Sequence, residues 1–244
     1  MPPIVATSSA LDVSGQLKNK RKMIIAFKIF LIIHIAGGST GLLTGLINII
    51  QKKGAERHKQ IGIVFYFSML TAGLSSIVLS WLHPNIFLFM VGLFTLYMIV
   101  SGKRYLKNKK TETQGVEKID WAISIIMLIG GFLFVGLGIW SIIKSNLFGV
   151  VFVTFGSLGL LFVWQDFINF TKKSSIKNYW LIGHLQRMTG AFIASITAFL
   201  VVNAKYFPDI IPGFVYWLIP TIIFTPLIVI WSKKYQVNIL KSKK

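Results

Sequence analysis

The sequence of 244 residues contains no cysteine and few acidic residues. Without cysteine, the chain cannot form disulfides, thiolate nucleophiles, cysteine-ligated zinc sites or cysteine-ligated iron–sulfur clusters. Any metal or cofactor must therefore be bound through His, Asp, Glu, Met or Tyr. Only 7 Asp and Glu stand against 26 Lys and Arg, and charged residues make up 14% of the chain. A soluble domain carries about a quarter charged residues, so the composition argues against a soluble protein.

Apolar sequence is abundant, at 54% of the residues. A window of about 20 residues, which matches a hydrocarbon layer about 30 Å thick, finds seven apolar segments. They are continuously apolar and lack the polar alternation of barrel strands. The sequence therefore predicts an all-α, polytopic membrane helix bundle with seven transmembrane helices, at residues 23–50, 60–82, 85–106, 119–143, 147–170, 179–203 and 212–231.

Polar segments flank this predicted seven-helix transmembrane domain, which extends over residues 23–235. Residues 1–22 are polar and basic, include Pro2, Pro3 and Gly15, and have no apolar core of the kind a signal peptide needs. We expect a disordered tail there rather than a cleaved signal peptide. Residues 236–244 are expected to form a basic C-terminal tail.

Basic residues fall mainly on one side of the predicted bundle. That side holds the first, third and fifth loops and the C-terminus, with Lys52, Lys53, Arg57, Lys59, Lys103, Arg104, Lys107, Lys109, Lys110, Lys118, Lys172, Lys173, Lys177, Lys233, Lys234, Lys241, Lys243 and Lys244. The positive-inside rule makes this side cytoplasmic, with the N-terminus out and the C-terminus in. The basic cluster at residues 18–22 opposes this orientation. The net charge of +19 then reflects topology and contact with anionic lipid headgroups of the bilayer, and no nucleic-acid partner is predicted.

Ionisable side chains inside the spans are candidates for a functional site, because an ionised group at mid-membrane costs roughly 2.5–3.5 kcal/mol. His184 and Arg187 are three residues apart and share one face of a predicted helix. His58, Asp120 and Asp166 are expected at the same depth, near the inner leaflet. Two interpretations stay open for this polar cluster. It is a functional site, or Arg187 forms an ion pair with Asp166 or Asp120 that closes the bundle while His184 is merely hydrogen-bonded.

The four histidines suggest a haem interpretation. Neutral imidazoles from different helices can be axial ligands of a b-type haem. His58 with His184 would form an inner pair and His34 with His83 an outer pair, and the chain would hold at most one haem. Cations that could meet the propionates are Arg57, Lys59 and Arg187. The first hypothesis is therefore a haem- or quinone-linked electron carrier.

Zinc-peptidase, nucleotide-binding and nucleophile-elbow signatures are absent. A membrane zinc hydrolase is a further possibility, but no His-x-x-x-His or His-Glu-x-x-His spacing occurs. The sequence therefore predicts no metal-ion site. Whether the protein is an enzyme is left open by the sequence.

Small residues recur along one face of three predicted helices, at Gly38, Gly41, Gly45, Gly131, Gly138, Gly149, Gly156 and Gly159. Such faces allow tight helix contacts in lipid, or they could line a site for a flat cofactor or a lipid tail. With a last helix kinked by Pro220 and Pro226, they support a second hypothesis, a small-molecule or lipid binding or transport protein. A non-catalytic membrane assembly partner is the third.

Several short motifs are similar to a family of membrane proteins. They are His34-Ile35-Ala36-Gly37-Gly38, Leu42-Leu43-Thr44-Gly45, Lys53-Gly54, His58-Lys59-Gln60-Ile61-Gly62, Asp120-Trp121, Gly183-His184-Leu185-Gln186-Arg187-Met188 and the run from Thr197 to Asn203. Together they resemble domain of unknown function family 2306, over residues 34–235. The resemblance implies a multi-pass protein of the bacterial cytoplasmic (inner) membrane and no particular activity. Members tend to carry a His-Arg pair where this chain has His58-Lys59, so no arginine role is carried over there.

Overall fold

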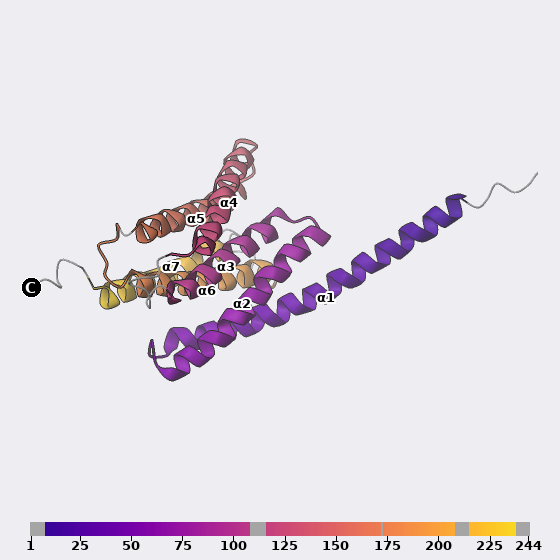
Figure 1. The fold of residues 1–244 in the computed structure, drawn as a ribbon. Helices are drawn as coiled ribbons and strands as arrows, with labels where there is room; N and C mark the ends of the chain where they lie inside the picture. Colours follow the sequence, from indigo (N-terminus) through magenta and orange to yellow (C-terminus); the bar gives the residue numbers. More distant parts are fainter. Residues whose placement is uncertain (1–7, 108–115, 172, 208–214, 238–244) are drawn as a thin grey trace, which may run out of the picture.

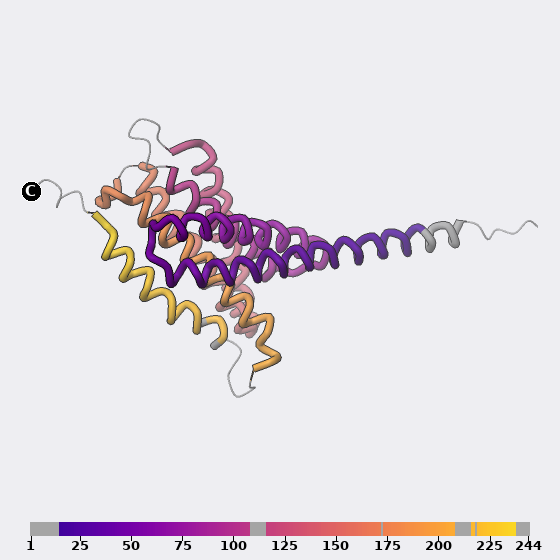
Figure 2. The backbone as a smooth tube through the Cα atoms, turned by 90° about the horizontal axis from the view of Figure 1, so that it is seen from below, coloured from indigo at the N-terminus to yellow at the C-terminus, as the bar shows by residue number. Residues whose placement is uncertain are grey.

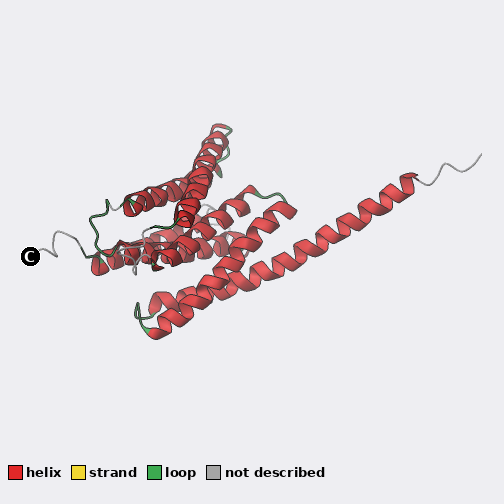
Figure 3. Ribbon diagram, in the orientation of Figure 1, coloured by secondary structure: helices red, strands yellow, loops and turns green. Residues whose placement is uncertain are grey.

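The computed structural model describes residues 8–107, 116–171, 173–207 and 215–237, and this part of the chain is built from helices (Figures 1 and 3). The elements are α1 (Ser8–Ile50), α2 (Glu56–Leu82), α3 (Ile86–Tyr105), α4 (Lys118–Ile143), α5 (Gly149–Phe170), α6 (Tyr179–Val202), the short 3₁₀ helix η2 (Ala204–Tyr206) and α7 (Val215–Tyr235). Within these residues, six helices, α1 to α6, are long and apolar enough to cross a membrane. The all-α prediction is thus confirmed.

Local signals at the helix ends explain where several helices begin and end. The Asn85 side chain accepts a hydrogen bond from the Leu88 amide at 3.0 Å and caps α3. At the start of α4 the Glu117 amide donates to Asp120 Oδ2 at 2.9 Å, within a reciprocal capping box. Gly54, in the turn after α1, has a φ of +80°, a backbone conformation that residues with a side chain rarely adopt.

Helix α1 differs from the sequence prediction because it begins at Ser8 rather than near Met23. Residues 8–22, expected in a disordered tail, continue the helix. They contain no proline and several good helix formers, and extending an existing helix avoids the cost of nucleation. Residues 1–7 of the expected tail, residues 238–244 of the C-terminal tail, and the basic residues Lys109, Lys110 and Lys172 lie outside the described residues.

Helices α3 and α6 form the centre of the bundle. They pack against each other, α2 joins α1 to α3, and α7 lies along α6. Helices α4 and α5 form an antiparallel hairpin that contacts the bundle mainly through α3. In Figures 1 and 2 the hairpin stands at an angle to the other helices, and the N-terminal part of α1 extends well beyond them.

Glycines bring helices of this bundle into close contact. A Cβ built on Gly138 of α4 would lie 2.7 Å from the carbonyl oxygen of Gly149 in α5, and one on Gly156 would lie 2.8 Å from that of Gly131. In α1, a Cβ on Gly45 would meet the ring of Phe192 at 2.4 Å. These glycine positions are therefore occupied by neighbouring helices and do not line a cavity.

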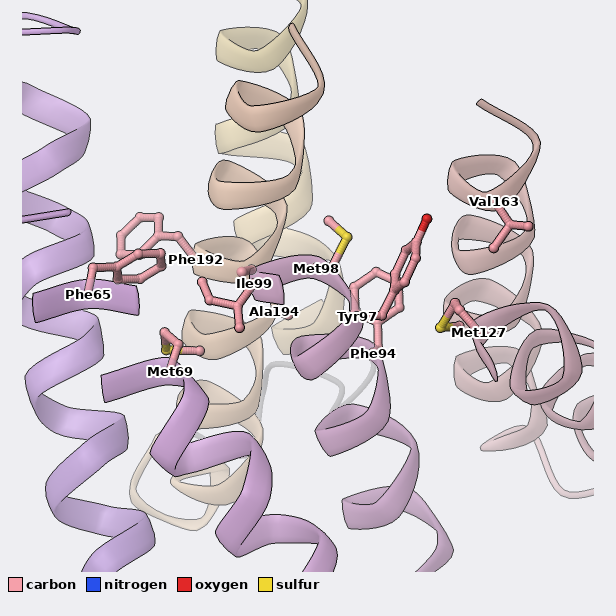
Figure 4. Close-up of a cluster of buried hydrophobic side chains, with 11 residues drawn as sticks. Phe65, Met69, Phe94, Tyr97, Met98, Ile99, Met127, Val163, Phe192 and Ala194 are labelled. Carbon is pink, nitrogen blue, oxygen red and sulfur yellow. The ribbon is translucent and has the colours of Figure 1, made fainter. Parts of the chain in front are cut away.

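Large apolar side chains form a core between the helices, while others face outward. Figure 4 shows side chains from α2, α3 and α6 together with Met127 and Val163, and Tyr97 lies between them. On the outer surface, Phe132 is 63% exposed and Leu161 is 62% exposed. Apolar side chains on the outside, with polar ones buried inside, fit an integral multi-pass membrane protein.

One end of the bundle gathers the basic loops, and we call it the basic end, formed by residues 51–59, 103–107, 117–120, 173–178 and 233–237. Contacts between distant segments hold it together. The Lys177 amide donates to the Val237 carbonyl at 2.7 Å, and Asn178 Nδ2 donates to the Tyr235 carbonyl at 2.7 Å. Lys53 Nζ lies 4.0 Å from the centre of the Trp231 ring. Partial burial lowers the pKa of the Lys53 ammonium to about 8, so it is mostly charged at neutral pH.

Candidate functional site: a buried ion pair and a histidine pair

A buried ion pair joins α5 to α6. Arg187 Nη2 lies 2.6 Å from Asp166 Oδ1, and both side chains are 0% exposed. A pair of opposite charges in an apolar interior is stable only when the remaining hydrogen-bonding atoms of both groups also find partners. The groups around the two residues therefore decide whether the pair is stabilised.

Three hydroxyl groups surround the Asp166 carboxylate. Tyr97 OH donates to Oδ2 at 2.5 Å, Tyr105 OH to Oδ1 at 2.6 Å, and Ser124 Oγ to Oδ2 at 2.9 Å. With the guanidinium, the carboxylate accepts four hydrogen bonds, which occupy about as many sites as a carboxylate offers. Both oxygens of the buried Asp166 carboxylate therefore have hydrogen-bond partners.

Arg187 is held by α5 through several contacts. Its Nη1 donates to Gln165 Oε1 at 3.0 Å, and its Nη2 donates to the Phe162 carbonyl at 2.9 Å. The guanidinium also lies 4.2 Å from the centre of the Phe162 ring, within the range of a cation–π contact. Its Nε is buried without a partner among the described residues. Because this guanidinium is fully enclosed, it is not placed to meet a haem propionate as the sequence suggested.

Asp120 belongs to a second cluster at the start of α4. Arg104 Nε contacts Asp120 Oδ1, and Arg104 Nη2 contacts Glu117 Oε2 at 2.8 Å. The sequence left open which carboxylate pairs with Arg187. In the structure Asp166 pairs with Arg187 and Asp120 pairs with Arg104, so the two carboxylates serve different arginines.

His184, on α6, and His58, on α2, lie within electrostatic range of each other at the basic end. His184 Nδ1 is 2.9 Å from the Gly102 carbonyl oxygen of α3. Because a carbonyl oxygen only accepts, Nδ1 carries the proton and Nε2 carries a lone pair in the neutral ring. His58, on α2, is near enough to act electrostatically on His184. Among the described residues neither the His58 ring nor His184 Nε2 has a hydrogen-bond partner. Lys103 acts electrostatically on His184 as well, and Lys53 acts on His58.

His34 and His83 are not brought together in the same way. His34 Nδ1 contacts the Ala72 carbonyl at 2.9 Å and Ser75 Oγ at 3.2 Å. The His83 ring lies 5.9 Å from that of Phe27. Ser75 and His83 are separated by eight residues of α2, a rise of about 12 Å. His34 therefore serves the contact between α1 and α2, and the outer histidine pair suggested by the sequence does not form.

Several members of the buried network were not identified from the sequence. Tyr97, Ser101 and Tyr105 follow one another at intervals of four residues on α3, which places them on one face. Ser101 Oγ donates to the Tyr97 carbonyl at 2.6 Å. A regular spacing of hydroxyl side chains within an apolar span could have drawn attention to these residues.

The fold and the buried charges define a class of protein: a multi-pass helical membrane protein with a buried ion pair between α5 and α6 and two histidines within electrostatic range of each other. Comparisons with models of known protein families, with curated proteins and with solved structures found no match. Within the described residues, no group of three or more His, Cys, Asp or Glu side chains is arranged to hold a metal ion.

Proposed function

We propose that the protein is a membrane electron carrier in which His58 and His184 are the axial ligands of a b-type haem at the basic end. The observation that carries the proposal is that two imidazoles, from helices far apart in sequence, lie within electrostatic range of each other. One of them has its tautomer set by a backbone carbonyl. A ligating histidine usually donates its other ring N–H to such a partner, which leaves the lone pair directed at the metal.

The number of ligands favours haem over a simple metal ion. Two imidazoles alone leave a zinc or iron ion short of protein ligands, and no third ligand joins them within the described residues. A porphyrin brings its own nitrogen ligands and needs the protein only at the axial positions. Lys53 and Lys103, which interact electrostatically with the two imidazoles, supply the positive charge that carboxylate groups on the porphyrin require.

The residues of the chain have separate roles in this proposal. His184 is oriented by the Gly102 carbonyl, and His58 approaches from the first turn of α2. Arg187 and Asp166 hold α6 against α5 and so position His184. When bound, a haem supplies one-electron transfer through its iron.

We further propose the topology suggested by the sequence. Helix α7, with 21 residues, has a length of about 32 Å and would be the seventh span. The positive-inside rule then makes the basic end cytoplasmic, with the N-terminus out and the C-terminus in. The resemblance to domain of unknown function family 2306 supports a location in the bacterial cytoplasmic membrane.

The proposal is tested by the absorbance spectrum of protein expressed with added haem and purified in detergent. We expect a Soret band in the wild-type protein and its loss in His58→Ala and in His184→Gln. The glutamine keeps a side-chain donor that can reach the Gly102 carbonyl. His83→Ala, at an exposed histidine on the other end of α2, is the matched control and should keep the band.

Size-exclusion chromatography of each variant separates loss of haem from loss of folding. A folded wild-type protein without a Soret band would overturn the haem proposal. So would a band that both histidine variants retain.

A further inference from the structure

The N-terminal part of α1 projects beyond the other helices at the end of the bundle opposite the basic end (Figures 1 and 2). The ring of Phe27 lies 5.9 Å from that of His83, the residue that follows α2, so α2 ends near the level of Phe27. On the N-terminal side of this level, α1 carries a cluster of cations that the haem proposal does not use. We call it the basic collar, formed by Lys18, Lys20, Arg21 and Lys22.

The helix is exposed on every side at the collar and next to it. Each residue from 17 to 25 is exposed, a run of more than two helical turns. Three of these residues are apolar, since Met23 is 53% exposed and Ile24 and Ile25 are each 48% exposed. Apolar side chains on all sides of an unpacked helix favour a lipid environment over water. The boundary between Lys22 and Met23 therefore marks the level at which α1 leaves the hydrocarbon layer.

The collar matches the thickness of the headgroup layer. Lys18 and Lys22 are four residues apart, which corresponds to a rise of about 6 Å along the helix. The headgroup region adds roughly 5–8 Å on each side of a hydrocarbon core about 30 Å thick. A helix that leaves the hydrocarbon at Met23 thus places all four cations at the level of the headgroups.

The protein does not neutralise the charge of the collar. The sequence has no acidic residue between Asp12 and Glu56. Within the described part of the chain, none of the four cations forms a salt bridge. Lys18 lies one turn from Arg21 and from Lys22, and like charges at these spacings destabilise a helix. Anions bound from outside the chain would remove this repulsion.

The directions of the cations favour lipid over a docked protein. Successive residues differ in direction by about 100°, so Lys20, Arg21 and Lys22 point to three sides of the helix. A docked protein would contact one of these sides, whereas the lipids around a helix meet all of them. The positive-inside rule does not account for the collar, which lies on the side with few basic residues. We propose that the basic collar binds the phosphate groups of anionic phospholipids in the leaflet opposite the basic end.

The test measures which lipids surround the collar in full-length protein reconstituted into nanodiscs. A fluorophore is attached at Met23→Cys, a unique thiol because the chain has no cysteine. The quenchers are phosphatidylglycerol and phosphatidylcholine with a nitroxide near the top of the acyl chain, compared at the same low mole fraction. One lysine or arginine near an anionic surface contributes a factor of about five, so we expect at least about fivefold enrichment of phosphatidylglycerol. High salt should reduce this preference, because exposed charges are screened.

Two multiple variants then locate the lipid site. Replacing the four collar residues by glutamine should make the two lipids quench equally. The matched control replaces four exposed cations of the basic end, in Lys52→Gln, Arg57→Gln, Lys59→Gln and Lys177→Gln, and should keep the preference.

Equal quenching by the two lipids in the wild-type background would refute the proposal, as would a preference that survives in the collar variant or disappears equally in both variants. Absence of quenching by either lipid would place the collar clear of the bilayer, which would also refute the proposal and favour an acidic protein partner. The haem spectrum is independent of these results, so the two proposals can fail separately.

Discussion

Removing the guanidinium in Arg187→Met would leave the Asp166 carboxylate buried without its counter-charge. Breaking a buried ion pair in this way typically costs about 3–5 kcal/mol. Asp166 would keep hydrogen bonds from Tyr97, Tyr105 and Ser124, so we expect the lower end, about 3 kcal/mol. That free energy corresponds to a rise of roughly 150-fold in the unfolding equilibrium constant.

The assay is reversible unfolding of the detergent-purified protein, with a double-mutant cycle that includes Asp166→Asn. Asparagine removes the charge but keeps a carbonyl oxygen for the tyrosine hydroxyls. The double variant should therefore be more stable than Arg187→Met alone, by about 1–2 kcal/mol. Arg57→Met, at an exposed arginine, is the control and should change stability by less than about 0.5 kcal/mol. If Arg187→Met behaves like this control, or if the effects in the cycle simply add, the reasoning is refuted.

Two further substitutions, Gly138→Ala and Lys53→Met, test the close contact between α4 and α5 and the hydrogen bonds at the end of α1. Gly138→Ala should destabilise the protein by about 1–3 kcal/mol, because its Cβ would lie 2.7 Å from the Gly149 carbonyl oxygen, a backbone atom. Gly136→Ala is the matched control, because its Cβ would have nothing within 4 Å. It should leave stability unchanged or raise it by up to about 1 kcal/mol. Equal melting temperatures for the two glycine variants would contradict the close contact at Gly138. Lys53→Met should cost about 1 kcal/mol, since the carbonyl oxygens of Asn48 and Ile49 at the end of α1 lose the ammonium that donates to them. The exposed Lys52→Met is its control, and a similar loss of thermal stability in both would show that those bonds do not matter.

The positions of most helices could be predicted because an apolar run of span length is a local property of the sequence. The prediction of 179–203 for α6 compares with Tyr179–Val202, and 147–170 for α5 compares with Gly149–Phe170. The start of α1 could not be predicted in this way. Hydropathy marks the point where the chain becomes polar, whereas a helix can continue into polar sequence as long as its residues favour helix.

The partners of the buried charges could not be predicted from the sequence. Asp120 and Asp166 have the same expected depth, so depth alone does not assign either one to Arg187. The choice depends on the order and rotation of the helices: Arg104, at the end of α3, meets Asp120 at the start of α4, which leaves Asp166 to α6. Helix rotation is a tertiary property, set by packing rather than by local sequence.

The ion pair sets the rotation of α6, and the orientation of His184 depends on that rotation. Successive residues of a helix differ in direction by about 100°, so His184, Gln186 and Arg187 point to three different sides. Arg187 is fixed toward α5, which directs His184 to the α3 carbonyl of Gly102 and Gln186 to Ser232 of α7. The arrangement also needs close approach of α3, because a Cβ on Gly102 would lie 2.9 Å from that of Arg187. A side chain at Gly102 would push α6 away and disturb the ion pair together with the orientation of His184.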